Sequence, residues 1–179
     1  EARLMEEAIH AAKQAEVVVM VLGGIELTVR EDRSRTSLNL PGRQEELLKA
    51  VCATGKPVVL VLLDGRASSI NYAAAHVPAI LHAWFPGEFC GQAVAEALFG
   101  DYNPGGRLAV TFPKSVGQIP FAFPFKPGSD ESSSTSVYGV LYPFGHGLSY
   151  TTFSYGDLKI SPLRQGVPVS YTHLRAHET

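Results

Sequence analysis

Continuous apolar runs alternate along this chain with segments whose apolar residues recur every three or four positions. The runs cover residues 17–22, 58–63 and 79–84, and each is typical of a strand buried on both faces of a parallel sheet. Helical spacing predicts helices over residues 1–15 and 42–53, near 70–75, and around 94–99. This alternation predicts an α/β fold, in which an open, mostly parallel sheet is sandwiched by helices.

Residues 84–113 read WFPGEFCGQAVAEALFGDYNPGGRLAVTFP and predict a β–α–β unit. Pro86-Gly87 favours a sharp turn after the third strand, and Gly100 suits the end of the following helix. The NPGG sequence then predicts a turn before a fourth strand at residues 108–112. One face of the helix is expected to be buried by Val94, Ala95, Leu98 and Phe99. Further on, residues 142–150 hold too many turn-forming residues for a regular element.

Composition narrows the class of protein. A chain of 179 residues with 45% hydrophobic and 18% charged residues can bury one substantial core. The formal net charge of −2 argues against a nucleic-acid partner, and no apolar run is long enough to span a membrane. The two cysteines exclude a disulfide framework and a cysteine-rich zinc site. We expect Cys52 to pack as a small apolar residue, and we favour a chance apolar substitution over a reactive thiol for Cys90.

Four segments together resemble one known family. They are residues 84–113, SLNLPGRQEELLKAV (37–51), ATGKPVVLVLLDGR (53–66) and LYPFGHGLSYTTFSY (141–155). In this order they resemble the C-terminal α/β domain of glycoside hydrolase family 3, over most of residues 8–160. The resemblance implies that residues 1–150 are this domain and that residues 151–168 begin a linker toward a fibronectin-III-like domain.

The chain begins within a predicted helix and without methionine, so we expect a fragment of a longer protein. Compared with the family, its sheet is expected to lack a first strand and helix at the N-terminus. Residues 169–179 back-translate to a string that resembles transposase-adapter DNA of sequencing libraries. We therefore interpret them as a non-native tail, with an ordinary linker as the alternative. On that interpretation His173 and His177, four residues apart, are not metal ligands.

The resemblance also implies an activity for the full-length parent. Family members include β-glucosidases and β-xylosidases, which are retaining enzymes with two catalytic carboxylates and no cofactor or metal. In two-domain members a preceding barrel supplies the nucleophilic aspartate, and a loop of the α/β domain supplies the acid/base glutamate. The expected partners are thus a β-glucoside or β-xyloside and the missing barrel, and this fragment alone is expected to be inactive. A periplasmic or secreted parent is implied by the family alone.

The loop after the first strand carries the candidate chemistry. In open α/β sheets ligands bind beyond the carboxyl ends of the strands, where residues 23–37 are expected to lie. This loop carries three carboxylates among three arginines (Glu26, Glu31, Asp32, Arg30, Arg33 and Arg35), a mixture that is usually only a solvated surface. The resemblance makes Glu31 the candidate general acid/base, with Glu26 the runner-up because the loop varies in length. A structural role for both stays open, and no nucleophile is present in this chain.

Other polar and aromatic residues have a structural alternative that we favour. Asp64-Gly65-Arg66 suits a turn, Trp84 suits the core better than sugar stacking, and His146 suits packing better than a cleft. Asp101 and Arg107 flank the NPGG turn, where they could pair. The remaining histidines lack metal-ligand spacing, and the glycines at 145 and 147 do not form a nucleotide-binding loop.

Two other functions remain as alternatives to an enzyme. One is a non-catalytic carbohydrate-binding or scaffolding module, in which replacing Glu31 by glutamine would leave turnover intact. The other is an unrelated doubly wound protein that binds nucleotides or small metabolites. The second is disfavoured, because a long charged loop separates Gly23-Gly24 from the next predicted helix.

Overall fold

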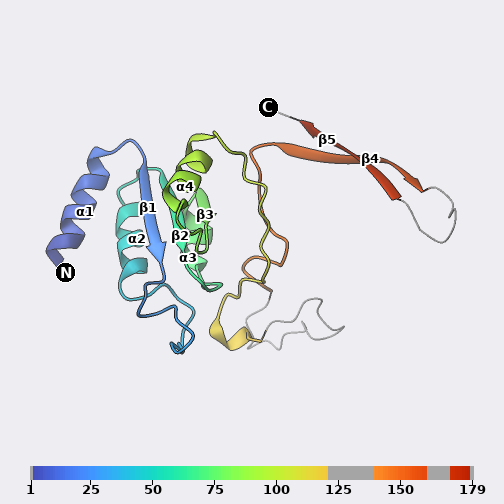
Figure 1. Cartoon of the computed structure of the whole chain (residues 1–179). Helices are drawn as coiled ribbons and strands as arrows, with labels where there is room; N and C mark the ends of the chain where they lie inside the picture. Colours follow the sequence, from blue (N-terminus) through green and yellow to red (C-terminus); the bar gives the residue numbers. More distant parts are fainter. Residues whose placement is uncertain (1, 121–138, 161–169, 178–179) are drawn as a thin grey trace.

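The computed structural model describes residues 2–120, 139–160 and 170–177 (Figure 1). The described residues form, in chain order, α1 (Ala2–Gln14), β1 (Val18–Gly23), α2 (Gln44–Cys52), β2 (Val58–Leu63), α3 (Asn71–His76), β3 (Ala79–His82), α4 (Cys90–Phe99), a 3-10 turn η1 (Val116–Gln118), β4 (Thr152–Ile160) and β5 (Ser170–His177). None of the helices among these residues is long and apolar enough to cross a membrane.

The first three strands form one parallel sheet in the order β1-β2-β3. Val18 pairs with Val58 at one end of the register, and Gly23 pairs with Leu63 at the other. β3 adds to the far side of β2, with Val59 opposite Ala79. The three strands and the helices between them follow the predicted alternation closely. The α/β fold with a parallel sheet is therefore confirmed.

One face of the sheet packs against α1, α2 and α3 and forms the hydrophobic core. Leu48 of α2 and Leu60 and Leu62 of β2 are fully buried there. The other buried members are Ala12, Met20, Leu40, Val51, Val58, Ile70, Ala73 and Val77. Cys52 packs against this cluster, as expected of a small apolar residue, and burial raises the pKa of its thiol.

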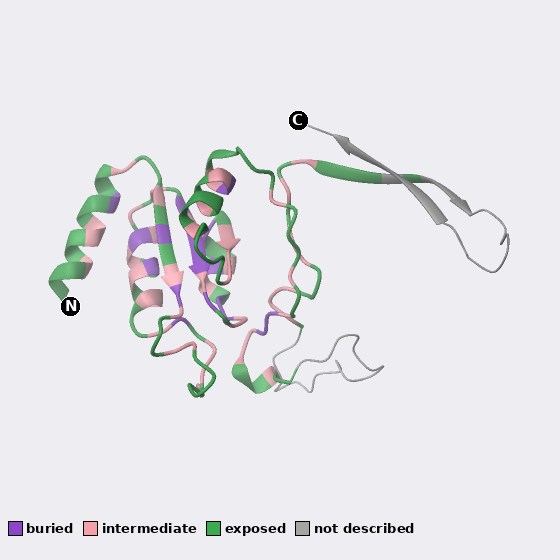
Figure 2. Ribbon diagram, in the orientation of Figure 1, coloured by how far each residue is buried: buried purple, intermediate pink, exposed green. Residues whose placement is uncertain are grey.

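The opposite face of the sheet is covered unevenly. Val61, which alternates with Leu60 and Leu62, is fully buried on this side, and Figure 1 shows α4 in front of β2 and β3. On β1, however, Val19 and Val21 are 50% and 56% exposed (Figure 2). The expectation that the run 17–22 is buried on both faces was therefore wrong. Among the described strands β1 pairs only with β2, so it is an edge strand that α1 and α2 cover on one side.

The predicted fourth strand at residues 108–112 was also wrong. Its backbone bonds to a later segment of the chain instead of joining the sheet. Leu108 donates its N–H to the carbonyl of His146, and Phe112 donates to the carbonyl of Tyr142, each at 2.8 Å. Phe112 and Tyr142 thus form an isolated antiparallel bridge. As expected, residues 142–150 form no helix or longer strand.

Helix α4 ends where the sequence predicts but buries a different set of residues. Gly100 takes a left-handed φ of +85° directly after Phe99, a conformation that glycine adopts without strain. Ala97 is the buried residue of the helix, whereas Ala95 is exposed and Phe99 is 84% exposed. The prediction that these two residues face the core was wrong. Cys90, the first residue of α4, is half-buried as a free thiol.

The C-terminal residues form a separate two-stranded sheet, in which β4 and β5 pair antiparallel with a register shift between Gly156 and Lys159. Figure 1 shows this hairpin extending away from the α/β body. β5 occupies most of the interval 169–179. A pairing of this kind does not test where those residues come from, so the non-native origin of the tail stays a prediction. Much of the predicted linker, residues 161–168, lies outside the described residues.

Candidate functional site

The candidate site lies at the edge of the sheet where the three parallel strands end. The β1–α2 loop (residues 24–43) follows β1, the β2–α3 turn (residues 64–70) follows β2, and residues 83–89 follow β3. Because the strands are parallel, all three segments leave the same edge (Figure 1). This is the edge at which open α/β sheets bind ligands.

Two glycines and a glutamine fix the start of the β1–α2 loop. Gln44 donates its side-chain amide to the carbonyl of Gly23 at 2.9 Å and accepts from the Gly23 N–H at 2.8 Å. A Cβ on Gly23 would lie 2.1 Å from the carbonyl oxygen of Leu63, and one on Gly24 would lie 2.2 Å from Val29. The loop therefore leaves the sheet along a path open only to glycine. The sequence analysis singled out the two glycines at the start of the loop, but it gave no role to Gln44.

The charged residues of the loop form a small network on its surface. Arg30 lies 3.1 Å from the carboxylate of Glu26 and 3.8 Å from that of Asp32. Arg33 also lies 3.8 Å from Asp32. All four side chains are about half exposed or more, so these ion pairs contribute little to stability. They do place a guanidinium beside the carboxylate of Glu26 and beside that of Asp32.

Glu31 differs from the other two carboxylates of the loop. Its side chain is exposed, and within the part of the chain that the structure describes no hydrogen bond or ion pair joins its carboxylate to another residue. The carboxylate is thus free to meet a ligand at this edge. Neither Glu26 nor Asp32 is free in this sense, because each already has an arginine partner.

Two arginines bind backbone carbonyls of the same loop. Arg35 donates to the carbonyl of Asn39, and Arg66, from the β2–α3 turn, donates to the carbonyl of Arg33, each at 2.6 Å. The sequence placed Arg35 in the loop and Arg66 in a turn, and did not indicate that Arg66 reaches across to the loop. This contact spans 33 positions, a separation that leaves no local pattern in the sequence.

The β2–α3 turn is built around a buried carboxylate. Asp64 is 0% exposed, and its Oδ2 accepts a hydrogen bond from Ser68 Oγ at 2.8 Å. The other oxygen, Oδ1, has no hydrogen-bond partner. Ser69 donates its N–H to the carbonyl of Leu38 at 2.8 Å and its hydroxyl to the carbonyl of Pro113 at 3.0 Å. Asp64-Gly65-Arg66 therefore lies in a turn, as favoured from the sequence.

An aromatic cluster lies after the third strand. The ring of His82 lies 4.2 Å from that of Trp84 and 5.2 Å from that of Phe112. Trp84 is half-buried with a φ of 54°, which is unusual for a residue other than glycine. Trp84 thus packs against His82 and Phe112 on one side, and the preference for a core role over sugar stacking stays a prediction. Both ring nitrogens of His82 are buried without a hydrogen-bond partner, and this burial lowers the pKa of His82.

This environment of His82 predicts a pH dependence of stability. Burial makes His82 bind a proton less readily in the folded chain than in the unfolded chain, where the ordinary pKa is 6.5. Protonation thus favours the unfolded state, so the free energy of unfolding falls as the pH drops below about 6.5. In thermal unfolding between about pH 8 and pH 5, we expect His82→Phe to flatten this fall. The exposed His10 serves as the control, since His10→Phe should keep the wild-type profile. Parallel profiles for His82→Phe and wild type would contradict the argument.

Two further expectations concern the segment after α4. Arg107 donates to the carbonyl of Gly106 at 2.9 Å and to Ser149 Oγ at 3.3 Å. No ion pair with Asp101 occurs among the described residues, so the pairing considered from the sequence was wrong. His146 stacks on Tyr142 at 4.9 Å, which agrees with a packed histidine.

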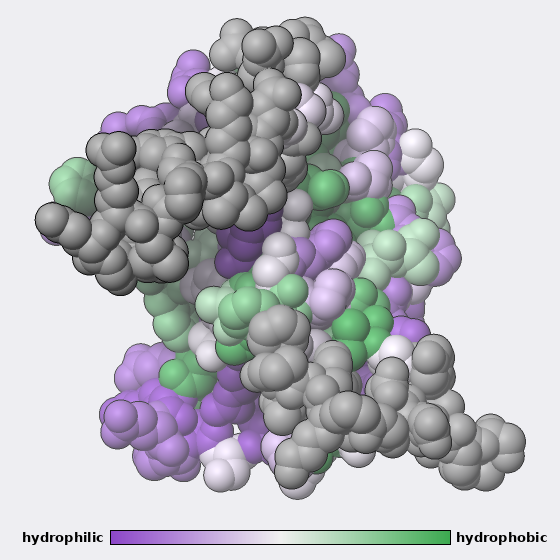
Figure 3. Space-filling model, turned by 90° about the vertical axis from the view of Figure 1, so that its right-hand side faces the viewer, coloured by the Kyte–Doolittle hydropathy of each residue, from purple (hydrophilic) through white to green (hydrophobic). Residues whose placement is uncertain are grey.

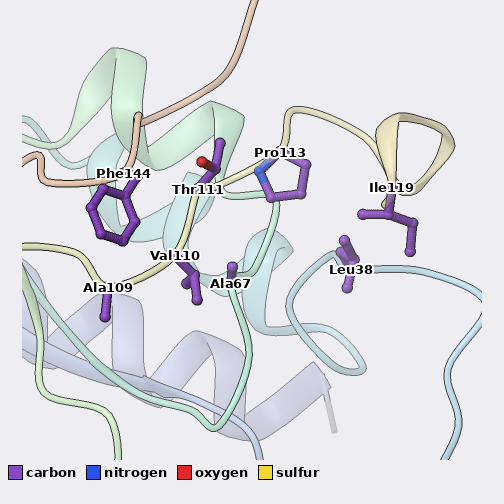
Figure 4. Close-up of a pocket in the computed structure, with 8 residues that line it drawn as sticks. All are labelled: Leu38, Ala67, Ala109, Val110, Thr111, Pro113, Ile119 and Phe144. Carbon is purple, nitrogen blue, oxygen red and sulfur yellow. The ribbon is translucent and has the colours of Figure 1, made fainter. Parts of the chain in front are cut away.

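A hollow of about 550 Å³ lies beside the loop and the turn. Figure 4 shows Phe144 on one side of it, Leu38 and Ile119 on the other, and Ala67 and Val110 between them. Ala109, Thr111 and Pro113 complete the lining, none of which titrates. The space-filling view shows hydrophobic residues among hydrophilic ones across the middle of the face it presents, and a hydrophilic group at the lower left (Figure 3). The hollow offers apolar contact, and the carboxylates of the loop and of the β2–α3 turn lie outside its lining.

Comparison with known proteins gives one consistent family. The glycosyl hydrolase family 3 C-terminal domain matches residues 2–150. A β-xylosidase of Formosa agariphila is 48% identical over 158 residues, which are 86% of this chain and 22% of that protein. A periplasmic β-glucosidase of Salmonella typhimurium is 44% identical over 169 residues, or 88% of this chain and 22% of that protein.

Solved structures agree with this result. The β-glucosidase EmGH1 of Erythrobacter marinus superimposes with a TM-score of 0.83 at 45% identity, covering 90% of this chain and 22% of that one. The β-glucosidase of Listeria innocua in complex with isofagomine gives a TM-score of 0.77 at 31% identity, covering 92% and 24%. The chain spans about a fifth of the length of the curated relatives that it matches. It belongs to the glycosyl hydrolase family 3 C-terminal domain family.

Proposed function

We propose that this chain is the α/β part of a retaining β-glycosidase that hydrolyses terminal β-linked glucosides or xylosides. The relatives named β-xylosidase and β-glucosidase support this class of substrate. Glu31 acts as the general acid/base. The observation that carries this role is the state of the loop's carboxylates, because Glu26 and Asp32 each have an arginine partner whereas Glu31 has none among the described residues.

The chemistry follows from this difference. A general acid must hold a proton until the glycosidic oxygen leaves, and a neighbouring guanidinium works against this by favouring the carboxylate. Glu31 would protonate the leaving oxygen in the first step and take a proton from water in the second. The exposed position of Glu31 at the sheet edge lets it face a second domain. That domain, a barrel elsewhere in the same protein, would supply the nucleophilic aspartate and bury the acid.

No step of this reaction needs a metal or an organic cofactor, because two carboxylates suffice for double displacement. The metal-ligating side chains of the described residues do not gather into a group that could hold an ion. We also propose a periplasmic or secreted location for the parent protein. Support for this comes from the Salmonella typhimurium relative, which is named a periplasmic enzyme.

The proposal is tested with the complete protein and with this chain alone. The complete protein should hydrolyse aryl β-glucosides or β-xylosides, and proton NMR should detect the β-anomer as the first product, since double displacement retains configuration. The chain alone should show no hydrolysis, because it lacks the nucleophile. A first product of α-configuration would refute the retaining mechanism. A complete protein that binds β-glycosides without cleaving them would instead identify a non-catalytic carbohydrate-binding module.

A further inference from the structure

We infer that Arg66 is a positioning residue, which holds the backbone beside Glu31 and so sets how well Glu31 transfers its proton. The inference rests on the proposed role of Glu31. Arg66 lies outside the loop, in the β2–α3 turn, and contacts neither Glu31 nor the reacting atoms. Its guanidinium donates to the carbonyl of Arg33, two residues after Glu31 in the sequence.

Apart from Arg66, hydrogen bonds among the described residues join the loop to the rest of the domain at its start and at Leu38. Gln44 binds both backbone groups of Gly23, and Gly24 donates its N–H to the carbonyl of Leu63 at 3.0 Å. At the other end, Leu38 accepts from the N–H of Ser69. Between these ends, in residues 25–37, Arg66 is the one side chain from outside the β1–α2 loop that makes a hydrogen bond, as far as the described residues extend. The position of the middle of the loop therefore depends on this contact.

The loop's own hydrogen bonds hold its first part but do not anchor it. Thr28 closes a turn by bonding the N–H of Ile25 at 2.9 Å and its carbonyl at 3.0 Å. Arg33 donates its N–H to the carbonyl of Arg30 at 3.0 Å, which closes a second turn around Glu31. Both turns are internal to the loop and could move as a unit. Arg66 binds the second turn at its last residue and connects it to the body of the domain.

Arg66 can act as an anchor because its own turn is rigid. The buried Asp64 accepts from Ser68 Oγ across the turn, and Ser69 reaches Pro113. Gly65 also lies close to residues 83–89, since a Cβ there would lie 2.6 Å from the ring of Phe85. A charged donor on a carbonyl acceptor at 2.6 Å is also stronger than a hydrogen bond between neutral groups. The hydrogen bond from Arg66 thus holds the backbone of Arg33, beside Glu31, against the end of the sheet.

The inference predicts a defect specific to proton transfer. Removing the guanidinium with Arg66→Met in the complete protein should shift the carboxylate of Glu31 away from the leaving oxygen. A shift of about 1 Å can lower the rate by ~10²-fold. The loss should fall on substrates whose leaving group needs a proton, such as phenyl and alkyl β-glycosides. Dinitrophenyl β-glycosides need no such help, so their glycosylation step should change less than about threefold. KM for the poor substrates should change less than kcat.

The experiment measures kcat/KM against leaving-group pKa for wild type, Arg66→Met, Arg66→Lys and Glu31→Gln. Arg107→Met is the matched control, since Arg107 also donates to a backbone carbonyl but at the NPGG corner. We expect kcat/KM to fall more steeply with leaving-group pKa in Arg66→Met than in wild type, and most steeply in Glu31→Gln. Arg66→Lys should give a slope between those of wild type and Arg66→Met, and Arg107→Met should keep the wild-type slope. Where Arg66→Met lowers the melting temperature, the slope of Arg66→Lys decides.

The outcomes separate this inference from the proposed function. A steep slope for Glu31→Gln with a wild-type slope for both Arg66 variants would overturn the role of Arg66 alone. A uniform loss over all leaving groups in the Arg66 variants would do the same, because it would reflect general damage to the domain. A wild-type slope for Glu31→Gln would overturn the proposed role of Glu31 and the inference with it.

Discussion

Replacing Glu31 with glutamine in the complete protein is expected to lower turnover of alkyl β-glycosides by about 10²–10⁴-fold, the usual contribution of a general acid. Glutamine keeps the size and exposure of the side chain but cannot donate a proton to the leaving oxygen. Since the Glu31 carboxylate has no hydrogen bond or ion pair with the other described residues, the substitution should leave the fold of the domain unchanged. The expected loss is therefore chemical, and thermal unfolding of the variant should match that of wild type.

Three measurements identify the loss as one of acid/base catalysis. Dinitrophenyl β-glycosides should retain fast glycosylation, because their leaving group departs without a proton. Added azide should restore turnover of these substrates by attacking the glycosyl-enzyme directly and giving a β-glycosyl azide. The alkaline limb of the kcat/KM profile should disappear, since it reports the loss of the acid's proton in the free enzyme.

Glu26 provides the matched control in the same loop. Its carboxylate already pairs with Arg30 at 3.1 Å on the surface, so Glu26→Gln should remove less than about 1 kcal/mol of stability and leave turnover near wild type. If Glu26→Gln instead loses activity with restoration by azide while Glu31→Gln does not, the acid/base assignment moves to Glu26. Equal and small effects of both substitutions would support a binding module.

The sequence predicts the sheet well because its signal is local. Three uninterrupted apolar runs become β1, β2 and β3 with ends that shift by only one or two residues. The same signal fails at residues 108–112, where Leu108 and Phe112 satisfy their N–H groups with carbonyls from residues 142–146. A short apolar run shows that its residues are buried, but it does not show what they pair with. The pairing partners, His146 for Leu108 and Tyr142 for Phe112, lie far along the chain, beyond any local pattern.

In the candidate site, too, the sequence predicts local features but not the contacts between distant residues. The position of Glu31 comes from the resemblance, and the loop's place at the strand ends comes from the α/β alternation. Arg66 and Gln44, which hold the loop, act through contacts over 33 and 21 positions. Their residue types are common at surfaces, so only the folded arrangement distinguishes them. The sequence could list the charges of the loop, but it could not assign which carboxylate each arginine binds.

Replacing Phe112 with alanine should have the largest effect on stability among substitutions outside the strands. Phe112 is 1% exposed, and its ring meets those of His82, Trp84 and Tyr142 edge-on or nearly so. Its backbone also bonds Tyr142 and Leu141, at 2.8 Å in each case. The residue thus joins the non-helical segment after α4 to the end of β3. Removing the ring should leave a cavity between these parts.

We expect Phe112→Ala to lower the free energy of unfolding by about 3–5 kcal/mol, the usual cost of deleting a buried aromatic ring. The comparison is Phe99→Ala, since Phe99 has the same side chain at 84% exposure and should change stability by only about 0.5 kcal/mol. Urea unfolding of the chain, followed by the fluorescence of its single tryptophan, Trp84, measures both variants at the ring that Phe112 contacts. Equal stability losses for the two phenylalanines would mean that residues 108–112 do not pack on the sheet as described. A larger loss for Phe112 would show that this segment is part of the fold despite its lack of strand structure.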